Sequence, residues 1–180
     1  MISKYDYAVG EAGAAPAYWP PGLPFGRDAG RPTLLIIAHP KCSCTRATLE
    51  NLNRLLTKCG GRVAVRVLFI RPKGQSQEWV RTDLWRSAAA IPGVVVAEDP
   101  DGALARTFGA ATSGYALLYD ASGRLEFCGG ITDGRGHVGD NPGAEAVVSL
   151  INGGAGLQAR APVYGCSLLE TSCRARDSSK

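Results

Sequence analysis

An apolar segment, an amphipathic segment and a second apolar segment follow one another early in the chain. Residues 33–38 (TLLIIA) and 63–70 (VAVRVLFI) have the composition of largely buried strands. Between them, residues 44–59 place leucines on one face of a helix and charged side chains on the other, and Gly60 and Gly61 end it. A helix between two buried strands predicts a parallel strand pair, because a helical crossover lets the second strand run in the same direction as the first.

The same alternation continues and then changes to a hairpin. The further expected elements are a helix over 77–90, a strand over 94–96, a short helix from Asp99-Pro100 to about Phe108-Gly109, strands over 115–119 and 125–128 around a turn, and a last helix that begins after the N-cap Asn141. The resulting order, β-α-β-α-β-α-β-β-α, predicts an α/β three-layer sandwich in which helices flank a central mixed sheet.

The chain is long enough for one domain, with 180 residues. Residues 1–31 are rich in Gly, Ala and Pro, which predicts an extended N-terminal arm. Residues 32–153 contain the periodic segments and form the predicted domain. Residues 154–180 are expected to be an irregular segment that packs on the domain and ends in a frayed, polar tail.

Charge and hydropathy exclude two classes of partner. The chain has 20 basic and 16 acidic residues, and no dense basic block alternates with aromatic residues as a nucleic-acid surface requires. Charged residues such as Lys4, Asp6 and Glu11 interrupt the N-terminus, which has neither a signal-peptide core nor a run long enough to cross a bilayer. We therefore expect no nucleic-acid partner and a protein that is soluble as given.

The tripeptide Cys42-Ser43-Cys44 lies between the first predicted strand and the first predicted helix. A thiol at a helix N-terminus meets exposed N–H groups and the positive end of the helix dipole, which favour the thiolate. We expect Cys42 to be the more exposed nucleophile and Cys44 to be the resolving thiol, although the reverse assignment is open. A disulfide across a single spacer residue is strained, which makes it oxidising.

Three side chains near the cysteine pair are candidate supporting residues. Lys41 and Arg46 can stabilise a thiolate through their charge, and His39 can relay a proton. The alternative is equally open: Lys41 and Arg46 are then solvent-facing charges, and His39 only ends the strand.

Four short motifs carry a resemblance to a known family. They are residues 39–47 (HPKCSCTRA), residues 108–114 (FGAATSG), Gly129-Gly130-Ile131-Thr132 with Arg135-Gly136-His137, and Val163-Tyr164-Gly165-Cys166. Together they resemble the RedB-type bacterial thioredoxin-like proteins, in the TlpA-like and peroxiredoxin-like branch of the thioredoxin-fold superfamily. The resemblance implies a thioredoxin-like fold, a protein thiol or disulfide as redox partner, and a periplasmic or other extracytoplasmic location. Such proteins typically begin with a membrane anchor, which we do not find in this chain.

The resemblance also implies roles for two loops. Ser113-Gly114 occupies the place where thioredoxins carry a cis-proline, so we expect a trans peptide here and no docking of peptides in the thioredoxin manner. The hydroxyls of Thr112 and Ser113 could instead face a small oxidant or a different partner. In the glycine-rich loop 129–139, Arg135 and His137 could act in acid/base chemistry or anion binding, or they could belong to an ordinary loop.

The other cysteines have different expected roles. Cys59 and Cys128 are expected to be small buried hydrophobic residues. Cys166 could be a third redox thiol or form a stabilising link, and Cys173 lies in the polar tail.

Three functions remain open at this stage. The first is a thiol–disulfide oxidoreductase that cycles Cys42 and Cys44 and needs no cofactor. The second is a protein that binds copper or another soft metal through this pair and His39 or His137. The third is a peroxide reductase in which Cys42 becomes a sulfenic acid that Cys44 or Cys166 resolves. An iron–sulfur centre ranks last, because no ferredoxin spacing is present.

Overall fold

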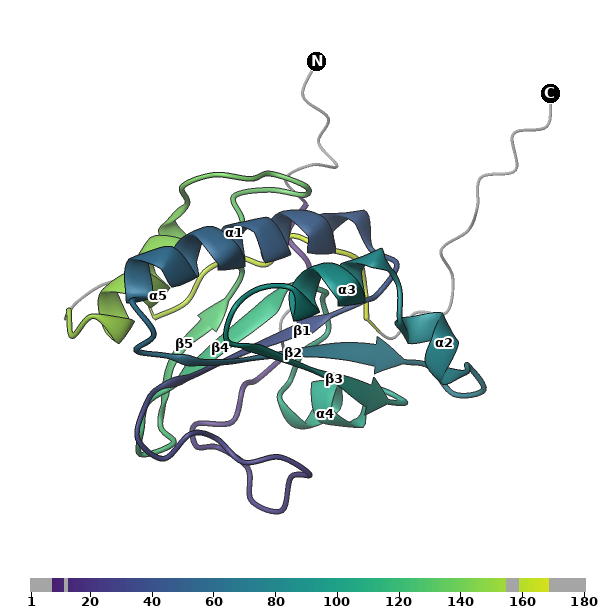
Figure 1. The fold of residues 1–180 in the computed structure, drawn as a ribbon, viewed down its shortest axis with the longest axis horizontal. Helices are drawn as coiled ribbons and strands as arrows, with labels where there is room; N and C mark the ends of the chain where they lie inside the picture. Colours follow the sequence, from purple (N-terminus) through teal and green to yellow (C-terminus); the bar gives the residue numbers. More distant parts are fainter. Residues whose placement is uncertain (1–7, 12, 155–158, 169–180) are drawn as a thin grey trace.

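The computed structural model describes residues 8–11, 13–154 and 159–168, and within them five strands form one mixed sheet (Figure 1). The strands are β1 (Thr33–Ala38), β2 (Ala64–Arg71), β3 (Val94–Pro100), β4 (Tyr115–Tyr119) and β5 (Leu125–Gly129), in the spatial order β3-β2-β1-β4-β5. Strands β1, β2 and β3 run parallel, whereas β4 is antiparallel to both β1 and β5. The central strand β1 is buried along its whole length, as its apolar sequence requires.

Helices cover both faces of this sheet (Figure 1). They are α1 (Ser43–Cys59), α2 (Gln77–Val80), α3 (Asp83–Ala89), α4 (Ala103–Thr107) and α5 (Pro142–Ile151). On one face, α1, α3 and α5 pack against alternate residues of β1 such as Leu34 and Ile36. On the other face, α4 and residues of the segments 15–25 and 163–168 pack against Leu35 and Ile37. The predicted α/β sandwich and its element order are therefore confirmed, and the architecture is thioredoxin-like.

The region predicted as one helix over 77–90 contains two helices, α2 and α3. Thr82, whose backbone is extended, separates the two helices. Its hydroxyl donates to the carbonyl oxygen of Pro40 at 2.8 Å. A tertiary hydrogen bond therefore overrides the helical periodicity and attaches this region to the loop that contains Cys42.

The third strand and the following helix also differ from the prediction. Strand β3 continues to Pro100, because it pairs with β2 as far as Arg71. The helix α4 starts at Ala103, not at Asp99. The buried carboxylate of Asp99 accepts hydrogen bonds from the first turn of α4, from the backbone N–H groups of Leu104 and Ala105.

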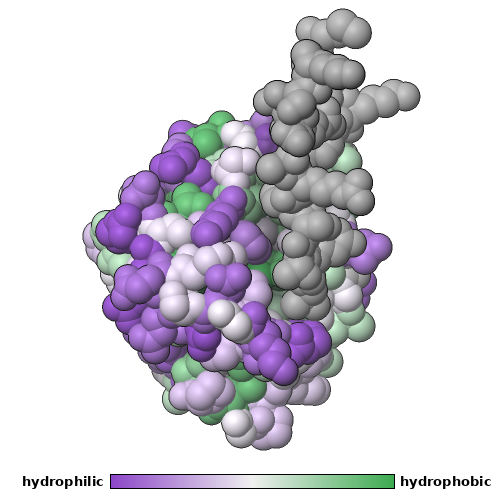
Figure 2. All heavy atoms as spheres, turned by 90° about the vertical axis from the view of Figure 1, so that its right-hand side faces the viewer, coloured by the Kyte–Doolittle hydropathy of each residue, from purple (hydrophilic) through white to green (hydrophobic). Residues whose placement is uncertain are grey.

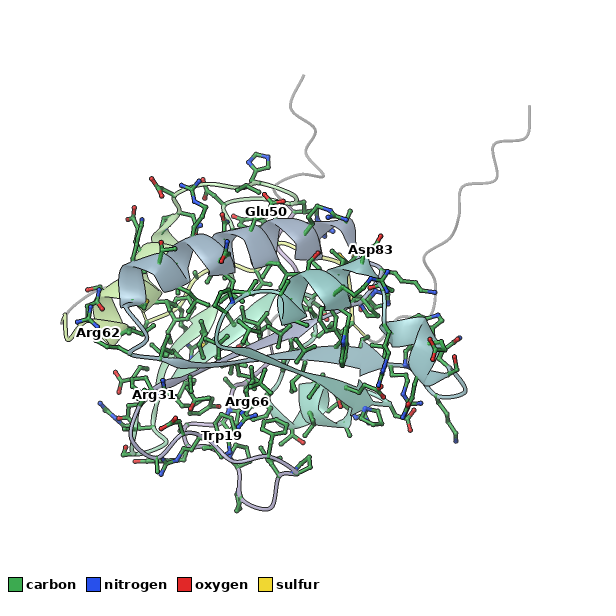
Figure 3. All side chains as sticks on the ribbon, viewed as in Figure 1. Trp19, Arg31, Glu50, Arg62, Arg66 and Asp83 are labelled. Atoms are coloured by element: carbon green, nitrogen blue, oxygen red, sulfur yellow. The ribbon has the colours of Figure 1, made fainter. Side chains whose placement is uncertain are left out.

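The N-terminal arm packs on the face of the sheet opposite α1. The ring of Trp19 makes edge contacts with the rings of Phe25, Phe108 and Tyr119. Figure 3 shows Trp19 on this side, while Glu50 of α1 points away from the sheet on the other side. The buried hydroxyl of Tyr119 donates to the carbonyl oxygen of Pro16 at 3.0 Å. The arm is thus attached by both aromatic packing and hydrogen bonding.

The C-terminal segment 159–168 runs back along the sheet toward the start of α1. It bonds first to Cys128 of β5, then to Gly130, and finally to the loop 111–113 that precedes β4. Cys173 and the rest of the predicted tail lie outside the described residues. Among the helices that are described, none combines the length and apolarity needed to span a bilayer.

Candidate functional site

Cys42 and Cys44 lie where β1 ends and α1 begins. Cys42 is the N-cap residue, with extended backbone (φ −92°, ψ 121°), and its N–H donates to the carbonyl oxygen of His39. Cys44 is in the first turn of the helix. The backbone N–H groups of that turn provide partial positive charge near the thiols, and the Cys44 N–H hydrogen bonds to the Cys42 sulfur. The local sequence therefore produces the expected position for reactive thiols.

A third thiol joins them from the far end of the chain. The backbone N–H of Ser113 donates to the carbonyl oxygen of Cys166 at 2.8 Å, and residues 112 and 167 form an isolated β-bridge. This pairing places the Sγ of Cys166 3.0 Å from the Sγ of Cys42. The three sulfur atoms of Cys42, Cys44 and Cys166 all lie within 4.8 Å of one another, and we call them the thiol cluster. All three are free thiols.

The three thiols of the cluster differ in acidity. The Cys166 thiol and then the Cys44 thiol hydrogen bond to the Cys42 sulfur, which lowers the pKa of Cys42 far below its ordinary value although burial opposes this. The Cys166 thiol also lowers the pKa of Cys44, but the hydrogen bond to Cys42 and burial outweigh it and raise that pKa overall. The hydrogen bonds to Cys42 and to Cys44 raise the pKa of Cys166. One thiolate at Cys42, stabilised by two thiols, is the expected state at neutral pH.

The expectation that Cys42 is more exposed than Cys44 is wrong. The relative exposure of Cys42 is 3% and that of Cys44 is 7%, while Cys166 is half-buried. The C-terminal segment lies next to the first turn of α1, and Cys166 is the most exposed residue of the cluster. Figure 2 faces the end of the molecule where α1 begins, and hydrophilic residues predominate among the coloured atoms in that view. Within this face, the low exposure of Cys42 and Cys44 leaves little of either residue open to solvent.

His39 and Lys41 both contact Trp79 of α2, a residue that the sequence did not single out. The Lys41 ammonium lies 4.4 Å from the centre of the Trp79 ring, and the His39 ring packs edge-on against it. Burial lowers the pKa of His39, although the charge of Cys42 opposes this, and Nδ1 of His39 accepts a hydrogen bond from the Lys41 N–H. The lowered pKa favours a neutral His39 imidazole next to Cys42. The Arg46 side chain is exposed to solvent.

Thr112 and Ser113 do not present their hydroxyls to an outside molecule, contrary to one expectation. Both residues are buried. The Thr112 hydroxyl donates to the carbonyl oxygen of Glu11, and Ser113 Oγ accepts from the His39 N–H at 2.9 Å and bonds to the Thr45 hydroxyl. Ser113 thus ties the loop before β4 to the start of α1. As expected, the described residues contain no cis peptide bond.

The glycine-rich loop brings one of its two candidate residues toward the cluster. The positive charge of Arg135 acts on Cys44 and lowers its pKa, against the larger effects that raise it. His137 is exposed, and it is its backbone carbonyl oxygen that meets α1, by accepting from Asn51. Neither His137 nor His39 belongs to the thiol cluster, which is the group of metal-capable ligands found among the described residues.

Asn51 positions this loop, and sequence reasoning missed it. It is buried on α1; its side-chain oxygen accepts from the Gly139 N–H, and its amide nitrogen donates to the carbonyl oxygens of Ile131 and His137. The available signal was a polar residue beside Leu52 on the inward side of a predicted helix. Through these bonds Asn51 holds the loop that carries Arg135 against α1.

Replacing Asn51 with alanine is expected to lower the free energy of unfolding by about 2–4 kcal/mol, because the Gly139 N–H and the His137 carbonyl lose their Asn51 partner and the Ile131 carbonyl keeps only its bond from Asn141. Denaturant unfolding followed by circular dichroism measures the change. Asn53→Ala is the matched control, since Asn53 is exposed on the same helix and its loss should cost about 0.5 kcal/mol or less. Equal effects of the two substitutions would contradict the positioning role of Asn51.

Comparison with known proteins finds solved structures with a similar fold. No protein-family model and no curated protein matches the chain. A hypothetical protein from Sinorhizobium meliloti is 20% identical, with 92% of this chain and 96% of that chain covered and a TM-score of 0.60. An uncharacterized conserved protein from Geobacillus kaustophilus is 15% identical, with 90% and 92% covered and a TM-score of 0.61. A more distant similarity is to the exposed lipoprotein thioredoxin from Streptococcus pneumoniae, at 17% identity, 69% and 86% coverage and a TM-score of 0.47.

The fold and the arrangement of its cysteines together define the class of protein. The chain is a thioredoxin-like α/β protein with two cysteines at the start of α1 and a third cysteine beside them. Its solved relatives of similar length share this fold at low sequence identity.

Proposed function

We propose that the protein is a thiol–disulfide oxidoreductase in which Cys42 is the nucleophile. The observation that carries the proposal is the 3.0 Å distance between the Sγ atoms of Cys42 and Cys166 at the N-terminus of α1. A nucleophilic thiolate and an adjacent thiol are the two groups that disulfide exchange requires.

The exchange proceeds in two displacement steps. The Cys42 thiolate attacks one sulfur of a partner disulfide, a bond forms between Cys42 and that sulfur, and the second partner sulfur leaves as a thiolate. Cys166 then gives up its proton to this leaving thiolate and attacks the Cys42 sulfur, which forms a Cys42–Cys166 disulfide and releases the first partner sulfur. The partner gains two electrons and the protein loses two. The same steps in reverse oxidise a partner dithiol.

Cys166 is favoured as the resolving thiol over Cys44. It is the thiol at 3.0 Å from Cys42, and it is the most accessible member of the cluster. Cys44 then serves as a hydrogen-bond donor to the Cys42 thiolate. The neutral His39 next to Cys42 supports the proton transfer. The positive charge of Arg135 lowers the pKa of Cys44, against the larger effects that raise it.

The biological setting follows from the resemblance of the four motifs to RedB-type proteins. That resemblance supports a protein redox partner and a location outside the cytoplasm. The division into an N-terminal arm, a domain over 32–153 and a C-terminal segment belongs to the same proposal, in which the last segment contributes Cys166 to the site.

Trapping of the mixed disulfide tests the proposal. In a Cys173→Ser background, the double variant C44S/C166S leaves Cys42 with no resolving thiol. Mixed with oxidised glutathione, it is expected to accumulate one glutathione adduct at Cys42, detected by intact mass and peptide mapping. The C173S parent should instead form an intramolecular disulfide.

Two single variants separate the resolving thiols. C166S should prolong the life of the adduct much more than C44S does. An adduct that maps to Cys59 or Cys128, or no adduct at all, would refute Cys42 as the nucleophile.

A further inference from the structure

The thiol cluster contains one sulfur more than disulfide exchange uses. Cys42 and Cys44 come from the start of α1, and Cys166 comes from the C-terminal segment, yet their sulfur atoms converge within 4.8 Å. A disulfide consumes two of them. A soft metal ion with three ligands would use all three.

The spacing of the sulfur atoms suits a three-coordinate metal. With metal–thiolate distances of about 2.3 Å, three sulfurs in a plane around one ion lie about 4 Å apart. The cluster lies within 4.8 Å, and the pair Cys42 and Cys166, at 3.0 Å, would open by about 1 Å. Cys166 is half-buried, and a change in its side-chain torsion can supply this movement while its backbone stays bonded to Ser113.

The surroundings select the type of metal. The cluster holds thiols alone among the described residues, without a carboxylate oxygen or an imidazole nitrogen, which disfavours hard cations such as Mg²⁺ and Ca²⁺. Zn²⁺ in structural sites takes four protein ligands, and the cluster offers three. Cu(I) is soft and suited to thiolates. Burial of Cys42 and Cys44 limits access of water, and the nearby charge of Arg135 offsets the net negative charge of Cu(I) with three thiolates.

We propose that Cys42, Cys44 and Cys166 of the reduced protein form a three-thiolate binding site for Cu(I). This site differs from the one expected from the sequence, because Cys166 takes the place of a histidine. Binding forms three copper–sulfur bonds and releases the protons of the Cys44 and Cys166 thiols, with no change in oxidation state. Metal binding and disulfide formation compete for the same sulfurs, so bound Cu(I) would block thiol exchange.

An anaerobic titration tests this site. The reduced, metal-free C173S protein is titrated with Cu(I) in the presence of bicinchoninate, a chromophoric competitor. One equivalent of Cu(I) should bind, and X-ray absorption should show three sulfur neighbours at about 2.3 Å. The C166S variant should bind about 100-fold more weakly or worse, beyond the loss typical of an outer-shell partner, and should show two sulfur neighbours.

Matched variants and a second metal complete the test. Cys59→Ala removes a buried thiol of α1 outside the cluster and should keep the full affinity, while circular dichroism confirms that each variant is folded. Failure of the C173S protein to compete with bicinchoninate, an unchanged affinity in C166S, or displacement of Cu(I) by equimolar Zn²⁺ would overturn the site. The trapping experiment uses metal-free protein, so a protein that binds Cu(I) but traps no adduct would refute only the oxidoreductase function.

Discussion

Replacing Cys42 with serine is expected to reduce the turnover of disulfide substrates to the uncatalysed rate. The hydrogen bonds from Cys166 and Cys44 lower the pKa of the Cys42 thiol, whereas the pKa values of Cys44 and Cys166 are raised overall. The thiolate is the attacking species, so the expected loss follows from removing the one thiol of the cluster whose pKa is lowered. Reduction of a small disulfide, followed with dithiothreitol as the electron donor, measures the loss.

Cys59→Ala is the control for this substitution, because it removes a thiol from the same helix without touching the cluster, and it should retain the full rate. Circular dichroism should show that Cys42→Ser keeps the fold. A folded Cys42→Ser protein with undiminished turnover would show that Cys44 or Cys166 is the nucleophile.

Replacing Gly165 with alanine is expected to slow formation of the Cys42–Cys166 disulfide by about 100-fold. A Cβ atom on Gly165 would lie 2.1 Å from the carbonyl oxygen of Ser113, and this contact is with backbone that cannot rotate away. The segment must therefore move, and the hydrogen bond from the Ser113 N–H to Cys166 is lost. A displacement of a reacting group by about 1 Å costs roughly 100-fold in rate.

The rate of this crosslink is measured by mass spectrometry in a defined glutathione buffer. Gly26→Ala is the matched control, because a Cβ on Gly26 meets no atom within 4 Å and its backbone is not left-handed. Its crosslinking rate should equal that of the unmodified protein. If Gly165→Ala also crosslinks at the unmodified rate, the close packing at Ser113 does not position Cys166.

Local patterns predicted most elements of the fold. Strand β1, helix α1 and the hairpin lie where periodicity and turn residues indicated, and Asn141 caps α5 through its side chain as expected. These features depend on neighbours within a few residues. The division of 77–90 into two helices was not predicted, because it depends on a hydrogen bond from Thr82 to Pro40, 42 residues away in sequence.

The site divides in the same way. A thiol pair at a helix N-terminus follows from Cys42-Ser43-Cys44 after an apolar strand, because the chain alone determines where the helix begins. Long-range packing determines the low exposure of Cys42, the internal hydrogen bonds of the Ser113 hydroxyl and the bonds of Asn51 to the glycine-rich loop. The sequence therefore did not show these features.

Local patterns were enough to predict the alternation of strands and helices, their buried faces and the place of two thiols, since periodicity and helix boundaries depend on nearby residues. The position of Cys166 beside these thiols arises from folding of the whole chain. That position depends on Gly165 fitting against the backbone of Ser113, a contact between segments about 50 residues apart whose free energy no local pattern encodes.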